Sequence, residues 1–355
     1  MPRRIDQVLA GFAEGDAISN EAVILQEVFR QWGTESEIFV DPAHTSSAVK
    51  TRCRPLADYR GTSGDLVIHH YSIASPAVDL FAAAPAVKVM IYHNITPSEY
   101  YRGFDDRVAR QLTEAREGLR AILPKMDAVW ADSRFNAQEL VELGGRDVQV
   151  LPLLFSAEQL DVPPDPEVFR KFAAPLTNIL FVGRLAPNKN VEELLEAFAW
   201  YHRTLNRQSR LIIVGSDRSA WRYFIMLKML AAEFDLTTAY FECYASPQEL
   251  SAYYNIAHAF VTCSRHEGYC LPLVEAMHRK VPVIARRTGG MPEALGGGGV
   301  LFDEAKPQEL AALMHRVVTD EPLRREVLTS QERRMAEVRA RRPDAELKAL
   351  LAKWL

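Results

Sequence analysis

The stretch Lys88-Val89-Met90-Ile91-Tyr92 decides the fold class of this chain, because it is a nearly continuous run of apolar residues. A second run of the same kind, Asp65-Leu66-Val67-Ile68, precedes it. Strands that are apolar along their whole length are buried on both faces, which is typical of a parallel sheet covered by helices. Longer helical patterns separate these runs, as in repeated βαβ units. The chain is therefore predicted to be α/β, with doubly wound, Rossmann-like sheets.

This alternation continues along the chain and is interrupted once. We predict strands at 5–10, 36–40, 65–70, 88–93, 128–132, 148–153, 178–183, 210–215, 239–243, 259–263, 281–285 and 299–302. Helices are predicted at 19–32, 76–83, 98–122, 134–143, 190–206, 219–234, 247–256, 271–279 and 306–319. The interruption, at 161–176, is rich in proline and polar residues and reads as a linker. We therefore predict domains at 1–160 and 177–335, and a helix at 336–355 for which packing back on the first domain is one option.

Size and composition limit the classes of function. The 355 residues suit two domains of about 150 residues each. The net charge of -4 gives no basic field for nucleic acid. No stretch approaches the roughly 18 apolar residues of a spanning helix, and polar residues at 3–7 stand where a signal peptide needs apolar ones. The four cysteines form no CxxC pair, as expected of reduced thiols. We expect a cytoplasmic protein.

The region after 321 is helical and rich in arginine, with acidic residues between the arginines. We interpret it as a solvated amphipathic helix. The alternative is a basic patch on the inner face of a membrane, with peripheral association.

Two cations lie on one predicted loop. The strand Asn178-Ile179-Leu180-Phe181-Val182 leads into Gly183 and Arg184, and Lys189 follows just before a helix. A guanidinium fork with an ammonium group suits a diphosphate. The alternative is a solvated loop with two exposed cations, on which Asn188 caps the helix.

A second loop carries two carboxylates. The stretch from Ser264 to Met277 has the pattern of a loop that enters a helix, with Glu267 before the turn and Glu275 within the helix. Pro272 suits a first helical turn, whose free amides favour an anion. Carboxylates beside such a terminus suit a ligand with phosphate and hydroxyl groups. The alternative is a turn residue and a surface helix residue.

The first half offers fewer signals. Gly15 and Asp16 lie on a small-residue loop after the first strand, and Ser19 follows as an N-cap candidate. His69 and His70 are placed on a loop after one strand, and His93 after the next. A histidine at the end of a strand can bond a sugar hydroxyl or polarise a leaving group. The spacing of the three histidines carries no metal signature, so we predict no metal site.

Together these motifs resemble those of the retaining glycosyltransferases of family 4, which have the GT-B fold. The match is specific in the second half, over Gly183-Arg184-Leu185, Lys189-Asn190, Glu267-Gly268, Leu271-Pro272, Glu275-Ala276-Met277 and Gly289-Gly290. The resemblance implies two Rossmann-like domains facing across a cleft. The first domain would lie on the acceptor side and the second would bind the donor. Cys270 and Lys280 depart from it, since the family often has glycine at both positions.

The resemblance also implies roles for these residues. Arg184 and Lys189 would hold the diphosphate and neutralise the leaving group. Glu275 would accept from the ribose, Glu267 would contact the sugar near its anomeric carbon, and His93 would contact the sugar from the first domain. The remaining implied donor residues are Gly15, Gly183, Gly268, Tyr269, Cys270 and Leu271, with Asp16, His69 and His70 on the acceptor side. No cofactor or metal is implied.

The combination of His69-His70-Tyr71-Ser72 with Tyr92-His93-Asn94-Ile95-Thr96-Pro97 resembles bacterial mannosyltransferases of polysaccharide assembly. The resemblance implies transfer of mannose from GDP-mannose to a glycan or lipid-linked acceptor, as in lipopolysaccharide biosynthesis. The alternatives are a UDP-sugar-dependent hexosyltransferase, a nucleotide-sugar epimerase and a non-catalytic nucleotide-sugar binder.

Overall fold

The computed structural model describes residues 2–216, 220–242 and 244–355. The chain divides into two compact units. The first unit contains the chain up to Pro97, Arg110–Phe155 and Arg341–Leu355, and the second contains Ser98–Ala109 and Ser156–Ala340. The boundary after Phe155 lies a few residues before the predicted one, and the last fifteen residues belong to the first unit.

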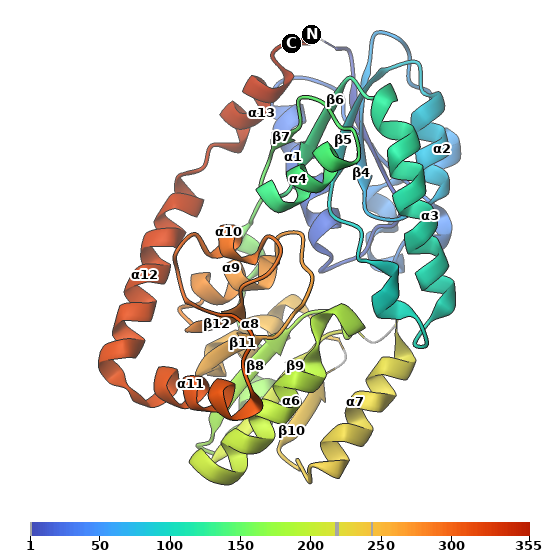
Figure 1. Cartoon of the computed structure of the whole chain (residues 1–355). Coiled ribbons are helices and arrows are strands. Elements are labelled where there is room, and N and C mark those ends of the chain that lie inside the picture. Colours follow the sequence, from blue (N-terminus) through green and yellow to red (C-terminus); the bar gives the residue numbers. More distant parts are fainter. Residues whose placement is uncertain (1, 217–219, 243) are drawn as a thin grey trace. The chain divides into compact units, whose positions relative to one another are not determined.

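The first unit is a seven-stranded parallel sheet with the strand order β3-β2-β1-β4-β5-β6-β7. Figure 1 labels four of its strands, β4, β5, β6 and β7. Its strands are β1 (Ile5–Leu9), β2 (Ile38–Val40), β3 (Arg54–Pro55), β4 (Leu66–Tyr71), β5 (Val87–Tyr92), β6 (Ala128–Ala131) and β7 (Gln149–Val150). Its helices are α1 (Ala17–Gln31), α2 (Pro76–Ala83), most of α3 (Asp106–Ile122), α4 (Arg134–Glu142) and α13 (Pro343–Leu351). The parallel sheet predicted from the apolar runs is therefore confirmed.

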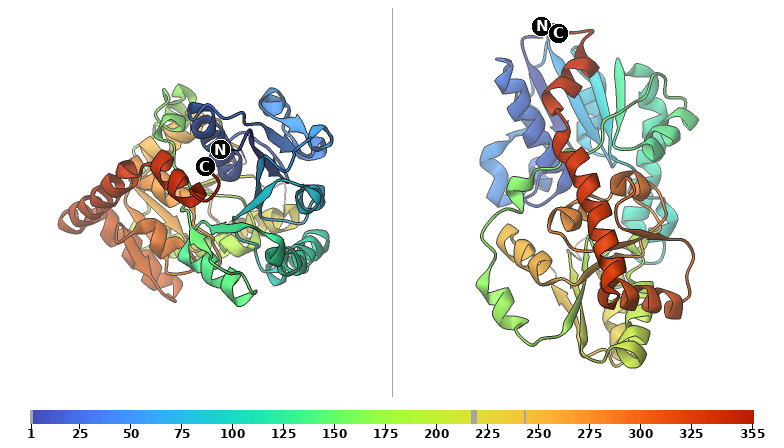
Figure 2. Two further views of the ribbon diagram at one scale, coloured as in Figure 1. Left: turned by 90° about the horizontal axis from the view of Figure 1, so that it is seen from above. Right: turned by 90° about the vertical axis from the view of Figure 1, so that its left-hand side faces the viewer.

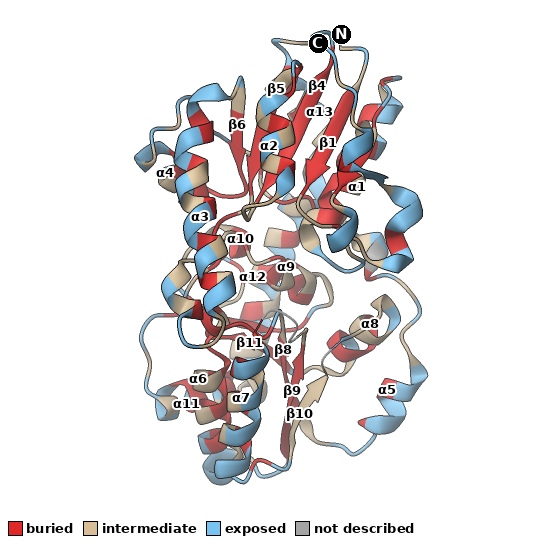
Figure 3. Ribbon diagram, turned by 90° about the vertical axis from the view of Figure 1, so that its right-hand side faces the viewer, coloured by how far each residue is buried: buried red, intermediate tan, exposed pale blue. Residues whose placement is uncertain are grey.

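Burial of the central strands explains their sequence (Figure 3). β1 and β4 are buried along their whole length. For β4 this confirms the prediction from its apolar run. Leu25 and Phe29 of α1 lie in one apolar cluster with Leu347 and Leu351 of α13. Figure 2 shows the C-terminal segment, in dark red, running beside the blue elements of the first unit. The C-terminal helix thus contributes to the core of the first unit.

The second unit is a six-stranded parallel sheet with the strand order β10-β9-β8-β11-β12-β13. Its strands are β8 (Thr177–Val182), β9 (Ser209–Val214), β10 (Ala239–Glu242), β11 (Ala259–Thr262), β12 (Val283–Arg286) and β13 (Val300–Phe302). Its helices are α5 (Pro166–Lys171), α6 (Val191–Trp200), α7 (Trp221–Glu233), α8 (Pro247–Ile256), α9 (Leu271–His278), α10 (Met291–Leu295), α11 (Pro307–Thr319) and α12 (Glu321–Ala340). α8, predicted at 247–256, begins with a capping box of Ser246 and Glu249.

Several local predictions differ from the structure. The predicted linker contains α5, which begins with Asp165 as N-cap and Pro166 in its first turn. The prediction of a linker was wrong for 166–171, because it took the prolines as a sign of irregular structure. Proline is also favoured at a first helical position, which Pro166 occupies. The predicted helix at 98–122 is two elements: a 3-10 turn, η4 (Ser98–Tyr101), and α3. Asp105 accepts the backbone N–H groups of Arg107 and Val108 at the start of α3. β3 and α10 were not predicted.

Other predicted ends fall outside the described residues. Position 219, where the predicted helix 219–234 begins, lies outside them. So does Cys243, where the predicted strand 239–243 ends. The described cysteines, Cys53, Cys263 and Cys270, are free thiols.

The arginine-rich region forms α12 and the start of α13. Within it, Arg334 donates to the carbonyls of Glu293 and Ala294 and pairs with Glu337. Arg339 pairs with Glu332. These two arginines therefore make their contacts within the protein, and peripheral association of this region with a membrane stays a prediction from the sequence. Among the described residues, no helix is long and apolar enough to cross a membrane.

Candidate functional site

The clearest pairing of predicted site residues is between Lys189 and Glu267. Lys189 Nζ lies 2.6 Å from Oε1 and 2.8 Å from Oε2 of Glu267. Lys189 ends the 3-10 turn η7 (Pro187–Lys189) after β8, and Glu267 lies on the loop after β11. β8 and β11 are neighbours in the sheet, so their carboxyl ends bring the two loops together. Only 15% of the lysine side chain and 9% of the glutamate side chain are exposed.

Backbone contacts hold these two loops in register. Asn188 Nδ2 donates to the carbonyl of His266 at 3.0 Å, and Asn188 O accepts from Arg265 N–H at 2.8 Å. The suggestion that Asn188 caps the following helix is therefore wrong, because its side chain joins the two loops. The N-cap residue of α6 is Asn190.

Gly289 supports the Glu267 loop from the opposite side. Its φ is +54°, and a Cβ there would collide with the carbonyl oxygen of Glu267. The next residue, Gly290, donates its N–H to that same oxygen at 2.9 Å. Only glycine allows this close approach, and the contact fixes the backbone that carries the Glu267 carboxylate.

Arg184 differs from Lys189 in its surroundings. It follows β8 on the same loop and is exposed. Within the described part of the chain, its guanidinium has no hydrogen-bond or ion-pair partner. Its neighbour Gly183 donates its N–H to Val214, which holds the loop on the end of β9. A cation that no protein group neutralises is available to an anionic ligand.

Glu275 lies on α9, where Tyr254 contacts it. The Tyr254 hydroxyl donates to Glu275 Oε2 at 2.8 Å. Burial raises the pKa of Glu275, and the bond from Tyr254 opposes this in part. The half-buried carboxylate thus has an oriented oxygen and is not a plain surface residue of the helix.

The N-terminus of α9 has an unusual backbone. Cys270, its N-cap residue, has φ +74°, and Lys280, just beyond its C-terminus, has φ +57°. Both values lie in the left-handed region that favours glycine. The backbone at both positions therefore suits the glycine that the resemblance implies, and Cys270 and Lys280 each place a side chain there. The neighbouring side chains of Tyr269 and Leu271 are buried, so only their backbone could face a ligand.

In the first unit, strand alternation separates the two adjacent histidines. Both lie within β4, not on a loop after it as predicted. His69 is fully buried on one face, where its Nδ1 lies 2.9 Å from the carbonyl of Val8. His70 faces the other side, because successive strand residues point in opposite directions. Neither ring reaches the surface, so neither is placed to contact an acceptor.

His70 belongs to a chain of buried hydrogen bonds with His93. His70 Nδ1 lies 2.8 Å from His93 Nε2, and His93 Nδ1 lies 3.1 Å from Asp132 Oδ2. At the other end, His70 Nε2 lies 2.9 Å from Gln7 Oε1. The His93 side chain is 1% exposed, so a ring contact with a donor sugar would require one of these bonds to open.

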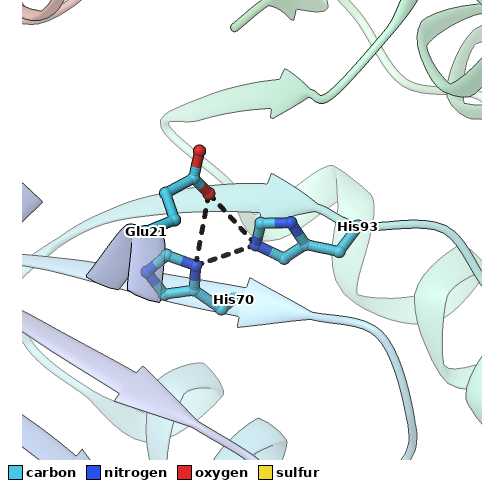
Figure 4. Close-up of side chains that lie close together, drawn as sticks. All are labelled: Glu21, His70 and His93. Atoms are coloured by element: carbon cyan, nitrogen blue, oxygen red, sulfur yellow. Dashed lines mark hydrogen bonds and ion pairs between the residues drawn. The ribbon is translucent and has the colours of Figure 1, made fainter. Parts of the chain in front are cut away.

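Glu21 of α1 completes this cluster (Figure 4). Its Oε2 lies 3.7 Å from His93 Nε2 and 4.0 Å from His70 Nδ1. Burial raises the pKa of Glu21 to about 7 and lowers that of His70 well below its ordinary value. Burial also opposes the charged form of His93, but the charge and hydrogen bond of Asp132 outweigh it, so the pKa of His93 is raised. Burial raises the pKa of Asp132.

The loop before α1 has a structural role. Gly15 has φ +74°, with open space where a Cβ would lie. Asp16 is the N-cap residue of α1 and accepts from Ser19 N–H at 2.9 Å and from the Ser19 hydroxyl at 2.7 Å. The N-cap is therefore Asp16 and not Ser19. To contact an acceptor substrate, the Asp16 carboxylate would have to give up its hydrogen bonds to Ser19.

Sequence reasoning missed Glu21, Gln7, Asp132 and Asn188. A signal for part of this set was present: β4, β5 and β6 each continue an apolar, every-second-residue pattern into a polar residue at the carboxyl end. The patterns are Leu66-x-Ile68-x-His70, Val89-x-Ile91-x-His93 and Ala128-x-Trp130-x-Asp132. Their alignment depends on the register between strands, which the sequence does not show.

Known proteins resemble parts of this chain in sequence. Residues 168–334 match the family model "Glycosyl transferases group 1". The chain is 25% identical over 276 residues to the serotype-specific mannosyltransferase WbdA of Escherichia coli; the match covers 72% of this chain and 32% of that protein. The chain thus spans about a third of the length of this relative.

Solved structures resemble the whole chain. Sucrose-phosphate synthase from Thermosynechococcus elongatus superposes with a TM-score of 0.74 at 19% identity, covering 99% of this chain and 98% of the other. Anabaena Alr3699/HepE, solved in complex with UDP-glucose, gives a TM-score of 0.74 at 17% identity and covers 98% of both chains. The fold of this chain is therefore the GT-B fold, and its residues 168–334 match the model of the group 1 glycosyl transferases.

Proposed function

We propose that the protein is a retaining glycosyltransferase that moves a hexose from a nucleotide sugar to a glycan or lipid-linked acceptor. The observation that carries this proposal is the arrangement of Arg184, Lys189 and Glu267 on the loops after β8 and β11. One cation, Arg184, has no hydrogen-bond or ion-pair partner among the described residues, and a second, Lys189, is held by a carboxylate beside it. Such an arrangement suits a diphosphate that carries a sugar.

The proposed chemistry places each group at a different part of the donor. Arg184 and Lys189 bind the diphosphate, and their charge stabilises the negative charge that develops on it as the bond to the sugar breaks. Glu267 accepts hydrogen bonds from sugar hydroxyls and Glu275 from those of the ribose. The acceptor oxygen attacks on the face that the diphosphate leaves, and the departing phosphate takes its proton.

GDP-mannose is the proposed donor. The similarity to WbdA supports it, because that relative is named a mannosyltransferase. The alternative donor is a UDP-sugar, since a structure with the same fold is a complex with UDP-glucose. The use of a lipid-linked acceptor, peripheral contact with a membrane, a cytoplasmic location and transfer without a metal stay predictions from the sequence.

A donor screen tests the proposal. The protein is incubated with GDP-mannose, UDP-glucose, other nucleotide sugars, GDP and UDP, and the shift in Tm is measured, followed by slow donor hydrolysis. One nucleotide-sugar series should raise the Tm, because a ligand that binds only the folded state stabilises it. Arg184→Ala is the test variant: its guanidinium has no hydrogen-bond or ion-pair partner among the described residues, so the variant should fold normally and lose most of the shift. No shift with any donor would refute the proposal.

A further inference from the structure

We propose that Glu21, His70 and His93 form a site for one divalent transition-metal ion of the zinc class, buried at the carboxyl edge of the first sheet. Nothing in the proposed transfer reaction requires this ion. The inference therefore stands apart from the proposed function, and it departs from the expectation that the histidines hold no metal.

The first argument is the distance between the ligand atoms. His70 Nδ1, His93 Nε2 and Glu21 Oε2 all lie within 4.8 Å of one another, at 2.8, 3.7 and 4.0 Å. Around a tetrahedral zinc ion with bonds of about 2.1 Å, ligand atoms lie about 3.4 Å apart. Small rotations of the two rings and of the carboxylate, each moving its ligand atom by about half an ångström, would place all three atoms at that spacing.

The second argument is that another group orients each ligand. Gln7 Nε2 donates to the carbonyl of Ala22 at 2.8 Å, so Gln7 Oε1 faces His70 and accepts from its Nε2–H. The Nδ1 atom of His70 therefore carries a lone pair. Asp132 accepts from His93 Nδ1–H, which directs Nε2 of that ring toward the site. Metal-binding histidines in proteins are held in this way by a carboxylate or amide on the far nitrogen.

Glu21 supplies the third argument. Its Oε1 accepts the backbone N–H of Leu154 at 3.1 Å. Its Oε2 is buried and, within the described part of the chain, has no hydrogen-bond partner, although it points at two histidine nitrogens. A buried carboxylate oxygen without a partner is costly, and a metal ion would satisfy it. The charges would also balance, since a dication offsets the carboxylates of Glu21 and Asp132 while both histidines are neutral.

The donor set selects the class of metal. Two imidazole nitrogens and one carboxylate oxygen suit zinc, cobalt or nickel. Magnesium and calcium prefer sites made of oxygen atoms only. The Glu21 and His70 side chains are fully buried, and the ligands come from α1, β4 and the residue after β5. We therefore expect the ion to join α1 to the sheet and to raise the stability of the first unit.

The test uses the full chain without a histidine tag. The protein is treated with a chelator, dialysed and titrated with Zn²⁺ and Co²⁺, while metal content, Tm and the visible absorption of bound cobalt are measured. We expect one ion per chain, a higher Tm after reloading, and a cobalt spectrum of four-coordinate nitrogen and oxygen ligation. Binding should release the proton that lies between the two histidines, which calorimetry in buffers of different ionisation enthalpy measures.

Variants assign the ligands. Glu21→Gln and His70→Gln should lose metal affinity by at least tenfold, and Asp132→Asn, which removes only the orienting group, by about 10- to 100-fold. His69→Gln is the matched control: His69 is equally buried on the same strand but faces away, so this variant should bind the ion as the wild type does. If a ligand variant fails to fold, the wild-type cobalt spectrum still decides. The proposal is overturned if the wild type takes up no metal after chelator treatment and its Tm is the same before and after that treatment. The three side chains would then be part of a hydrogen-bonded chain that binds no metal.

Discussion

Lys189 Nζ contacts both carboxylate oxygens of Glu267, at 2.6 and 2.8 Å, across two loops that are far apart in the sequence. Arg184, on the same loop as Lys189, has no such partner in the described residues. The two cations of the proposed diphosphate site therefore have different effects when they are removed.

Lys189→Ala should affect both folding and donor binding. The substitution leaves Glu267 mostly buried without its partner, and we expect a loss of about 2 kcal/mol in the free energy of unfolding, below the range for fully buried pairs because both groups are slightly exposed. Urea denaturation measures this loss. The double variant Lys189→Ala with Glu267→Gln should recover part of it. If the double variant loses the sum of the two single effects, the pair is not coupled.

Arg184→Ala should affect binding alone. Its unfolding free energy should change by less than about 0.5 kcal/mol, because no described contact is lost. Diphosphate affinity should fall by about 10- to 100-fold, the range for a lost hydrogen bond to a charged group. Calorimetric titration with the nucleoside diphosphate measures this change. Wild-type affinity in this variant would remove Arg184 from the site.

Gly289→Ala should displace the Glu267 loop. The added methyl group would collide with the Glu267 carbonyl, and alanine is strained at φ +54°. We expect a loss of about 3 kcal/mol and reduced transfer. Gly297→Ala is the control, since Gly297 has φ +85° but open space at the Cβ position, and it should lose only about 1 kcal/mol. Equal losses in the two variants would argue against the contact with Glu267.

Lys280→Gly should stabilise the protein. Lys280 is exposed, and its φ of +57° follows the last turn of α9, where glycine is the favoured residue. Relief of the left-handed strain should raise the free energy of unfolding by about 0.5–1 kcal/mol. Lys50→Gly is the control, because Lys50 is also an exposed lysine but has no positive φ. Glycine should lower the free energy of unfolding at this position, since it only adds freedom to the unfolded chain. Thermal unfolding of both variants compares them.

Glu275→Gln should change the pH dependence of stability. Because burial raises the pKa of Glu275 in the folded protein above its ordinary value of 4.5, its folded state binds the proton more tightly than its unfolded state. This carboxyl group therefore favours folding at pH below 4.5, and its contribution is lost as the pH rises through the folded-state pKa. Relative to the wild type, Glu275→Gln should gain stability over that rise, measured by urea denaturation at each pH. In the variant Tyr254→Phe, the loss of unfolding free energy with rising pH should be larger than in the wild type. The hydroxyl that stabilises the Glu275 carboxylate by a hydrogen bond is absent from this variant.

Several features could be read from the sequence because they depend on neighbours along the chain. Apolar runs such as 88–92 predicted buried parallel strands, and the helical pattern at 247–256 predicted α8; the structure confirms both. Local signals also misled where two local rules competed. Pro166 was read as part of a linker, although the same residue suits the first turn of α5.

The sequence by itself determined the fold class and the segments that carry Arg184, Lys189, Glu267 and Glu275, because continuous apolar runs and the polar residues that follow them are local patterns. Only the tertiary structure decided which of these groups meet. The Lys189–Glu267 pair depends on β8 and β11 being neighbours, and the cluster of Glu21, His70 and His93 depends on strand register and on the packing of α1 against the sheet. Strand order and register arise from contacts between distant segments, and no single stretch of sequence contains them.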